Sequence, residues 1–307
     1  MNYTKLILLF LLTFSSVSFA GDKLDMSDPD DAFTVWAKLQ CNLEAGKPVL
    51  WWWHGKMYSR RSGEKDTALF NVQGMNVRQC HYKVDDVRGP GIRWTSREIL
   101  LFLDPATDEV LKTWKNPYTG ETVDVFQVFN DPVNTRGYIW ARDENGEPTG
   151  IGMDLKVFDD LILDGGGAAR LFYTNPLAGD YQEYIGGTYH AMELGAFSAN
   201  TAQGLSPDTT TIDDAMLSWG RISKWLPWMK MGDREGVVVF NTAGMRLQSY
   251  AELPDVLRNE IEATYPIYRE PPPIDDDRPN ETSWVVFKRL IEEQRAQQGA
   301  TSGAEEH

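Results

Sequence analysis

The feature that most constrains the fold is a long succession of short runs rich in β-branched and aromatic residues, separated by turn residues. Such runs are typical of β-strands, and segments 104–108 and 116–120 have the composition of hairpin turns. Strands joined by tight turns form an antiparallel meander, whose edges must be paired or covered. We therefore predict a mainly β protein, in which a long antiparallel meander closes into a calycin-like barrel or a strongly curled sheet.

Helices are expected on both flanks of this meander. Asp28 and Pro29 form a helix-start signal, followed by an apolar stripe that ends before Gly46. C-terminal helices are expected over 250–265 and 283–298. Segment 212–231 fits neither helical nor strand periodicity, so its conformation stays open. The predicted strands are 49–58, 68–78, 81–87, 92–103, 110–114, 122–129, 138–141, 153–158, 169–173, 184–197 and 237–242.

The first twenty residues have the pattern of a secretory signal peptide. Lys5 precedes an apolar run over 6–14, and small residues stand at Ser18 and Ala20. This apolar run is too short for a membrane span, so we expect no stable membrane insertion and a periplasmic or secreted protein. The remainder is predicted to be a single β-rich domain over 21–298 with a disordered tail over 299–307.

Charge and cysteine content bear on the partners and the compartment. The formal net charge of -15 disfavours binding to the phosphate backbone of nucleic acids, so no nucleic-acid partner is expected. An oxidising compartment would allow Cys41 and Cys80 to form a disulfide, although two buried free thiols are the alternative. The oligomeric state stays open.

Common catalytic motifs are absent from the sequence. It contains no GxSxG, HExxH, Walker-type or GxGxxG pattern, and no EF-hand loop. His54, His81 and His190 have no local metal-ligand spacing. We therefore expect neither a metal nor an organic cofactor, and a small molecule as the partner.

One candidate site lies on the aromatic strand over 49–58. Side chains alternate along a strand, so Trp52, His54 and Tyr58 share one face, whereas Trp51 and Trp53 share the other. If the first face points inward, an imidazole that exchanges protons near neutral pH lies beside an aromatic wall. The alternative is an aromatic core strand with His54 near a rim.

A second candidate is Glu98, which shares a strand face with Trp94 and other large apolar residues. A carboxyl group in such surroundings needs a partner or has a raised pKa, which is the condition of a general acid. The alternatives are a salt bridge to an arginine on a neighbouring strand and an outward-facing side chain.

Two further segments carry candidate ligand-binding groups. Asp131 and Asn134 lie in a loop at the end of a strand, where they either contact a ligand or form an ordinary turn. Trp219 and Trp228 belong to a Trp- and Met-rich stretch in which Arg221 either anchors an anion or pairs with a carboxylate. That stretch alternatively closes one end of the barrel.

Several motifs resemble the bacterial and fungal family called domain of unknown function 1838. They are FNVQGMNVR from Phe70, SREILLFLDPATDEVLKTWKNPYTGETVDVFQVFNDPVN from Ser96, SWGRISKWLPWMKMGDREG from Ser218 and NETSW from Asn280. The resemblance covers nearly the whole chain after the leader, but it implies no established catalytic residues. One departure is Asp108, where we would expect Gly, which puts the φ angle of that turn in question.

These observations predict an exported soluble protein that binds a small apolar or aromatic molecule in a Trp-lined cavity and transforms it by cofactor-independent acid/base chemistry. One alternative is a non-catalytic carrier of a hydrophobic ligand. Another is a carboxylate-based hydrolase of a saccharide or ester, which needs Glu98 and either Asp131 or Glu121 within about 5–9.5 Å. The candidate acid or base groups are His54, Glu98 and Asp131, and the candidate ligand-binding residues are Trp52, Tyr58, Trp94, Asn134, Trp219, Arg221 and Trp228.

Overall fold

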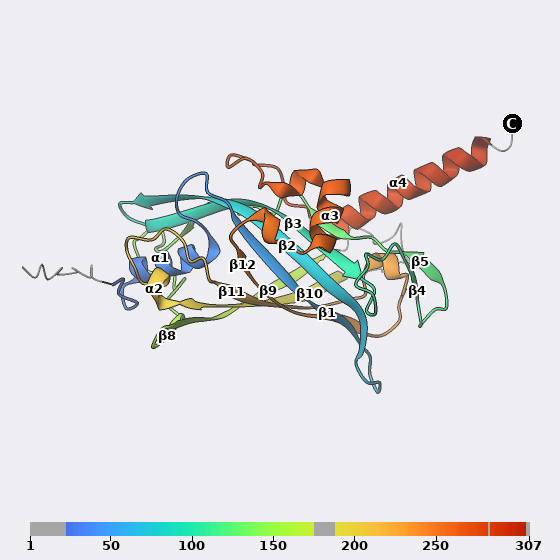
Figure 1. The fold of residues 1–307 in the computed structure, drawn as a ribbon, viewed down its shortest axis with the longest axis horizontal. Coiled ribbons are helices and arrows are strands. Elements are labelled where there is room, and N and C mark those ends of the chain that lie inside the picture. The colour runs from blue at the N-terminus through green and yellow to red at the C-terminus, as the bar shows by residue number, and fades with distance from the viewer. Residues whose placement is uncertain (1–22, 175–187, 282, 305–307) are drawn as a thin grey trace, which may run out of the picture.

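A computed structural model describes residues 23–174, 188–281 and 283–304 of the chain (Figure 1). The predicted signal peptide over 1–20 and the last residues of the predicted tail lie outside this part. Among the described residues, none of the helices combines the length and the apolar character that a membrane span requires.

One antiparallel sheet of ten strands dominates the structure, which confirms a mainly β fold. Its strand order is β6-β3-β2-β1-β12-β11-β10-β9-β8, and β7 also pairs with β3. The strands of this sheet are β1 (Val49–Arg60), β2 (Thr67–Asp85), β3 (Gly89–Leu103), β6 (Val128–Asn130), β7 (Ile139–Trp140), β8 (Lys156–Phe158), β9 (Leu161–Thr174), β10 (Thr188–Asn200), β11 (Met216–Ser223) and β12 (Val237–Leu247). A separate hairpin consists of β4 (Thr113–Lys115) and β5 (Thr122–Asp124).

The sheet does not close into the predicted calycin-like barrel within the described residues. The order ends at β6 and β8, and no strand pairing joins these two edges. Each of these edge strands has three residues, too few to pair along the full length of a neighbour. The centre of the sheet is instead the pairing of β1 with β12, two segments far apart in sequence.

Several predicted strands change their extent in the structure. Segments 68–78 and 81–87 form one continuous strand, β2, which pairs with β3 over its whole second half. The open segment 212–231 contains strand β11 and a 3-10 turn over Pro227–Met229. Asp108 has a φ angle of 58°, the left-handed conformation that favours glycine, and its carboxylate accepts a hydrogen bond from Asn71.

We call the face of the sheet that carries Trp51 and Trp53 the inner face. Helix α1 (Pro29–Gln40) covers one end of this face. Asp28 caps this helix because its carboxylate accepts hydrogen bonds from the backbone N–H groups of Asp30 and Asp31. The helix buries Val35 and Leu39 against tryptophans of β1. Directly after the helix, Cys41 forms a disulfide with Cys80 of β2, at a Cα–Cα distance of 5.9 Å. The bridge, which the sequence left open, ties α1 to the sheet.

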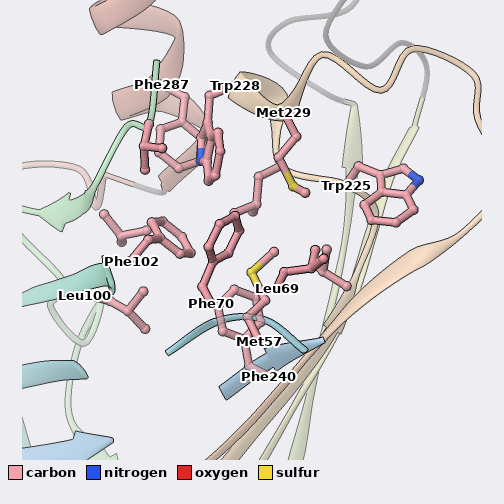
Figure 2. Packing of buried hydrophobic residues seen from close by; sticks show 14 of the residues in the cluster. Met57, Leu69, Phe70, Leu100, Phe102, Trp225, Trp228, Met229, Phe240 and Phe287 are labelled. Atoms are coloured by element: carbon pink, nitrogen blue, oxygen red, sulfur yellow. The ribbon is translucent and has the colours of Figure 1, made fainter. Parts of the chain in front are cut away.

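The other end of the inner face is closed by an aromatic cluster, which we call the end plug (Figure 2). Phe70 of β2, Phe102 of β3 and Trp228 of the 3-10 turn form its centre, with ring centroids 5.3–5.8 Å apart. Helix α4 (Ser283–Ala304) adds Trp284 and Phe287. This helix continues past the predicted end at Gln298 and projects away from the sheet (Figure 1).

The outer face of β1, β2 and β3 is also covered. Helices α2 (Thr201–Gly204) and α3 (Asp255–Thr264) and the 3-10 turns Tyr250–Glu252 and Pro266–Arg269 complete the helical elements. Leu257 and Ile261 of α3 pack against Ile99 and Leu101 of β3. The sheet therefore has apolar side chains on both faces in this region, and the spacing of apolar residues alone does not tell which face is inner.

Candidate functional site

Between helix α1 and the end plug, the inner face of the sheet surrounds a cavity. It consists of a larger chamber of about 130 Å³ and an adjoining chamber of about 30 Å³. Both chambers are lined by Trp53, Glu98 and Trp219. Trp219 lies on β11, several strands from β3 in the sheet order, so the sheet curls enough for the two strands to border one space. The larger chamber is also lined by Trp51, Asn76, Arg78, Gly195, Phe197, Leu217 and Ser218.

Glu98 is the titratable carboxyl group of the cavity wall. The register of β3 places it between Asn76 of β2 and Asn130 of β6. Its Oε1 accepts a hydrogen bond of 3.2 Å from Asn130 Nδ2. The side chain is enclosed by protein atoms and retains partial exposure toward the cavity. Glu98 is thus well placed to meet a bound molecule.

The surroundings of Glu98 raise its pKa to about 7. Desolvation is the largest cause because burial disfavours the charged carboxylate, and the negative charge of Glu193 acts in the same direction. Arg221, the hydrogen bond from Asn130, and Arg78 oppose this rise. At neutral pH the protonated and ionised forms of Glu98 are therefore both populated.

Trp53 forms an aromatic wall beside Glu98. It is 7% exposed, and its ring centroid lies 6.2 Å from that of Trp219. Its indole lies over Gly74, the residue opposite it in β2. The buried Trp53 Nε1 has no hydrogen-bond partner among the described residues. Trp53 therefore presents an apolar ring face to the cavity.

Gly74 is necessary for this position of the Trp53 ring. A Cβ atom on residue 74 would lie 2.5 Å from Trp53 Cε2 and 2.6 Å from Nε1, closer than atoms in real structures approach. We expect Gly74→Ala to displace the indole and to lower the free energy of unfolding by about 2 kcal/mol, a typical cost of overpacking. Urea unfolding measures this change. Gly137→Ala is the control because its new Cβ meets no atom within 4 Å; equal effects of the two substitutions would contradict the expectation.

Arg78 borders the larger chamber from β2. Its Nε donates a 2.9 Å hydrogen bond to Asn76 Oδ1, and its Nη1 donates one of 3.2 Å to Gln40 Oε1. The guanidinium lies over the ring of Trp94, 5.0 Å from the centroid. Desolvation lowers its pKa to about 10, against the opposing effect of Glu98, so the group stays cationic at neutral pH.

Arg221 lines the smaller chamber and pairs with a carboxylate, the second of the two interpretations from sequence. Its Nη1 lies 2.8 Å from Glu193 Oε1, the residue opposite it on β10. Its Nη2 also donates to the hydroxyl of Tyr189, which is fully buried. Glu193, Arg221 and Tyr189 therefore form a polar cluster across the cavity from Glu98.

The inward orientation considered for Trp52 and His54 is not the one in the structure. In β1 the inner face carries Trp51 and Trp53, whereas His54 is exposed on the outer face and stacks on Trp52 at 5.0 Å. Tyr58 follows the same alternation and borders a separate groove on the outer face. The phase of the strand is opposite to the one considered because helix α1 packs on the Trp51 side.

The remaining predicted residues lie outside the cavity lining. Asp131 forms ion pairs with Arg97 at 2.9 Å and with Arg278 at 2.8 Å. The buried Asn134 accepts a hydrogen bond from the backbone of Ser96. Neither residue lines the cavity. Trp94 lies beneath Arg78, and Trp228 belongs to the end plug.

The hydrolase alternative needs a second carboxyl group beside Glu98, and neither Asp131 nor Glu121 lines the cavity. Asp131 is held by Arg97, which directly precedes Glu98 and has its side chain on the opposite face of β3, and Glu121 is exposed in the turn between β4 and β5. Glu193 is instead the carboxylate whose charge acts on Glu98. Among the described residues, no three His, Cys, Asp or Glu side chains gather in an arrangement that would hold a metal ion.

Sequence reasoning placed Glu98, Trp219 and Arg221 among the candidates, and all three line the cavity. It missed Trp53 and Arg78. The alternation that placed Glu98 applies equally to β2, where Asn76, Arg78 and Cys80 share a face, but only the register with β3 shows that this face meets Glu98.

Comparison with known families gives a match over most of the chain. The family model described as "Protein of unknown function (DUF1838)" matches residues 46–291. The chain belongs to the DUF1838 family. The resemblance seen in the sequence is thereby confirmed, and the DUF1838 match contains every cavity-lining residue named above while α1 precedes it. A search of curated proteins found no match.

Proposed function

We propose that this DUF1838 protein is exported, binds a small apolar or aromatic molecule in the Trp-lined cavity and transforms it by proton transfer through Glu98. The observation that carries the proposal is the position of Glu98: a carboxyl group with a pKa near 7 in the wall of a cavity bordered by Trp53 and Trp219. A carboxyl with such a pKa in a cleft is a typical general acid or base.

The size of the larger chamber limits the ligand. An engineered apolar cavity of about 150 Å³ holds one benzene molecule, and the chamber here is about 130 Å³. A ligand of about one ring with a short substituent fits this space. The ring faces of Trp53, Trp219 and Phe197 suit an aromatic group, since offset and edge contacts between rings are favourable.

The chemistry follows from the two protonation states of Glu98. The protonated acid donates to an oxygen or carbon that gains negative charge, and the carboxylate accepts a proton from a bound acid. Asn130 holds Oε1, which leaves Oε2 as the oxygen for the ligand. Proton transfer of this kind needs no organic cofactor.

A non-catalytic carrier, in the manner of calycins, is the alternative. A carrier of apolar molecules gains nothing from a buried carboxyl group, whose ionisation is costly in such surroundings. Glu98 therefore favours the catalytic version. Recovery of every bound ligand unchanged, with no exchange of its acidic protons, would instead favour the carrier.

The location of binding is tested by filling the cavity. Gly195 lines the larger chamber and pairs with Trp219 in the register of β10 with β11. A Cβ atom on residue 195 meets no atom within 4 Å. We expect Gly195→Leu to weaken binding of benzyl alcohol more than tenfold, because the leucine side chain takes the space of the ring. Isothermal titration calorimetry measures the affinity.

Gly137→Leu is the matched control, since its Cβ also meets no atom within 4 Å and it lies outside the cavity lining. The control is expected to bind like the wild type. Unchanged affinity in the Gly195→Leu variant would show that the ligand binds elsewhere.

A further inference from the structure

The charges around the cavity differ in sign from the chain as a whole. The formal net charge of the protein is -15. In the lining of the larger chamber, however, the cation Arg78 is accompanied by one carboxyl group, Glu98, and Arg246, on which Asp213 acts, lies against the ring of Trp51. Arg221 adds no net charge because Glu193 pairs with it. The lining of the larger chamber therefore carries a net positive charge when Glu98 is protonated.

Arg246 donates hydrogen bonds to backbone carbonyl groups and to the hydroxyl of Thr211. It is 4% exposed and donates to the carbonyl oxygens of Leu39 and Ile212 at 2.6 and 2.7 Å. Its guanidinium lies 4.9 Å from the ring centroid of Trp51, a wall of the larger chamber. Carbonyl dipoles stabilise this cation but leave its formal charge in place, so it still attracts an anion nearby.

Arg78 is the cation that lines the larger chamber. No described carboxylate oxygen lies within ion-pair distance of it, and its two side-chain hydrogen bonds go to the neutral amides of Asn76 and Gln40. A guanidinium has five N–H donors, so donors remain for a ligand. A buried cation without a carboxylate is costly, and an anionic ligand removes that cost.

We propose that the ligand of the cavity is a small aromatic carboxylate, with its carboxylate group on Arg78 and its ring against Trp53 and Trp219. This inference rests on the proposed function and specifies its ligand class. The guanidinium fork matches the geometry of a carboxylate, and the cation of Arg78 and the two indole rings border the same chamber.

Binding of the proposed anion also depends on the protonation state of Glu98. Its charge repels ionised Glu98, so the complex favours protonated Glu98 and binding weakens as the pH rises above about 7. The other charged groups that act on Glu98 are Arg78 from β2, Arg221 from β11 and Glu193 from β10. Arg78 and Arg221 stay cationic across this range, so they do not cause the pH dependence.

The test compares benzoate with benzyl alcohol, which has a similar skeleton and no charge. At pH 6, calorimetry on the full chain is expected to give at least tenfold tighter binding of benzoate. We expect Arg78→Gln to remove this preference while benzyl alcohol still binds, and Arg78→Lys to retain part of it. Arg60→Gln, which changes an exposed arginine, is expected to behave like the wild type.

The outcomes separate the two proposals. Binding of benzyl alcohol as tight as that of benzoate in the wild-type protein would overturn the anion preference and leave the proposed function standing. Failure of both probes to bind would contradict the proposed function itself. The comparison in the wild-type protein decides the first question even if the Arg78 variants do not fold.

Discussion

Replacing Trp228 with alanine is expected to lower the free energy of unfolding by about 3–5 kcal/mol, the usual cost of removing a large buried aromatic side chain. Trp228 is 1% exposed, and its ring contacts those of Phe70, Phe102 and Trp114 at centroid distances of 5.3–6.1 Å (Figure 2). The 3-10 turn that carries it has three residues and cannot refill this space. Urea unfolding followed by circular dichroism measures the loss.

Trp52→Ala is the matched control for this prediction. Trp52 is a partly exposed tryptophan on the outer face, so the same truncation there removes less buried area and is expected to cost about 1–2 kcal/mol. Losses of equal size at the two positions would contradict the assignment of Trp228 to the end plug. The prediction thus also separates a structural role of Trp228 from the ligand-wall role considered from sequence.

The succession of strands could be predicted from sequence because its signals are local. The run over 92–103 alternates between two faces and is bounded by turn residues, and β3 occupies Gly89–Leu103. The phase of β1 could not be predicted, because both of its faces carry tryptophan. Trp51 and Trp53 pack toward α1, whereas Trp52 packs in the cluster beneath α3, so both faces are covered.

The register of distant strands and the grouping of the site residues could not be predicted, because both depend on long-range pairing. The contact of β1 with β12 joins residues near 50 to residues near 245, and no local pattern specifies that register. The proximity of Arg78 to Glu98 follows from the register of β2 with β3, and the effect of Glu193 on Glu98 follows from the curl of the whole sheet. The individual strand faces were therefore more predictable than the site that they assemble.

Replacing Glu98 with glutamine is expected to make the protein more stable than the wild type at alkaline pH. The pKa of Glu98 is raised from about 4.5 to about 7 in the folded protein, so the folded state holds a proton that the unfolded chain releases. This contribution to stability is complete below about pH 4.5 and is lost as the pH rises to about 7 and beyond. A pKa difference of this size corresponds to about 3 kcal/mol.

Glutamine keeps the oxygen that accepts from Asn130 Nδ2 and does not titrate, so the stability of the variant relative to the wild type should increase by about 3 kcal/mol between pH 4.5 and pH 8. Urea unfolding at both pH values measures this difference, and other titrating groups cancel because they are common to both proteins. Glu121→Gln is the control, since this exposed carboxyl in the β4–β5 turn should give no such increase. A constant difference between Glu98→Gln and the wild type would mean that Glu98 is already ionised in the acidic range, and the acid/base role proposed for it would then have no proton to transfer near neutral pH.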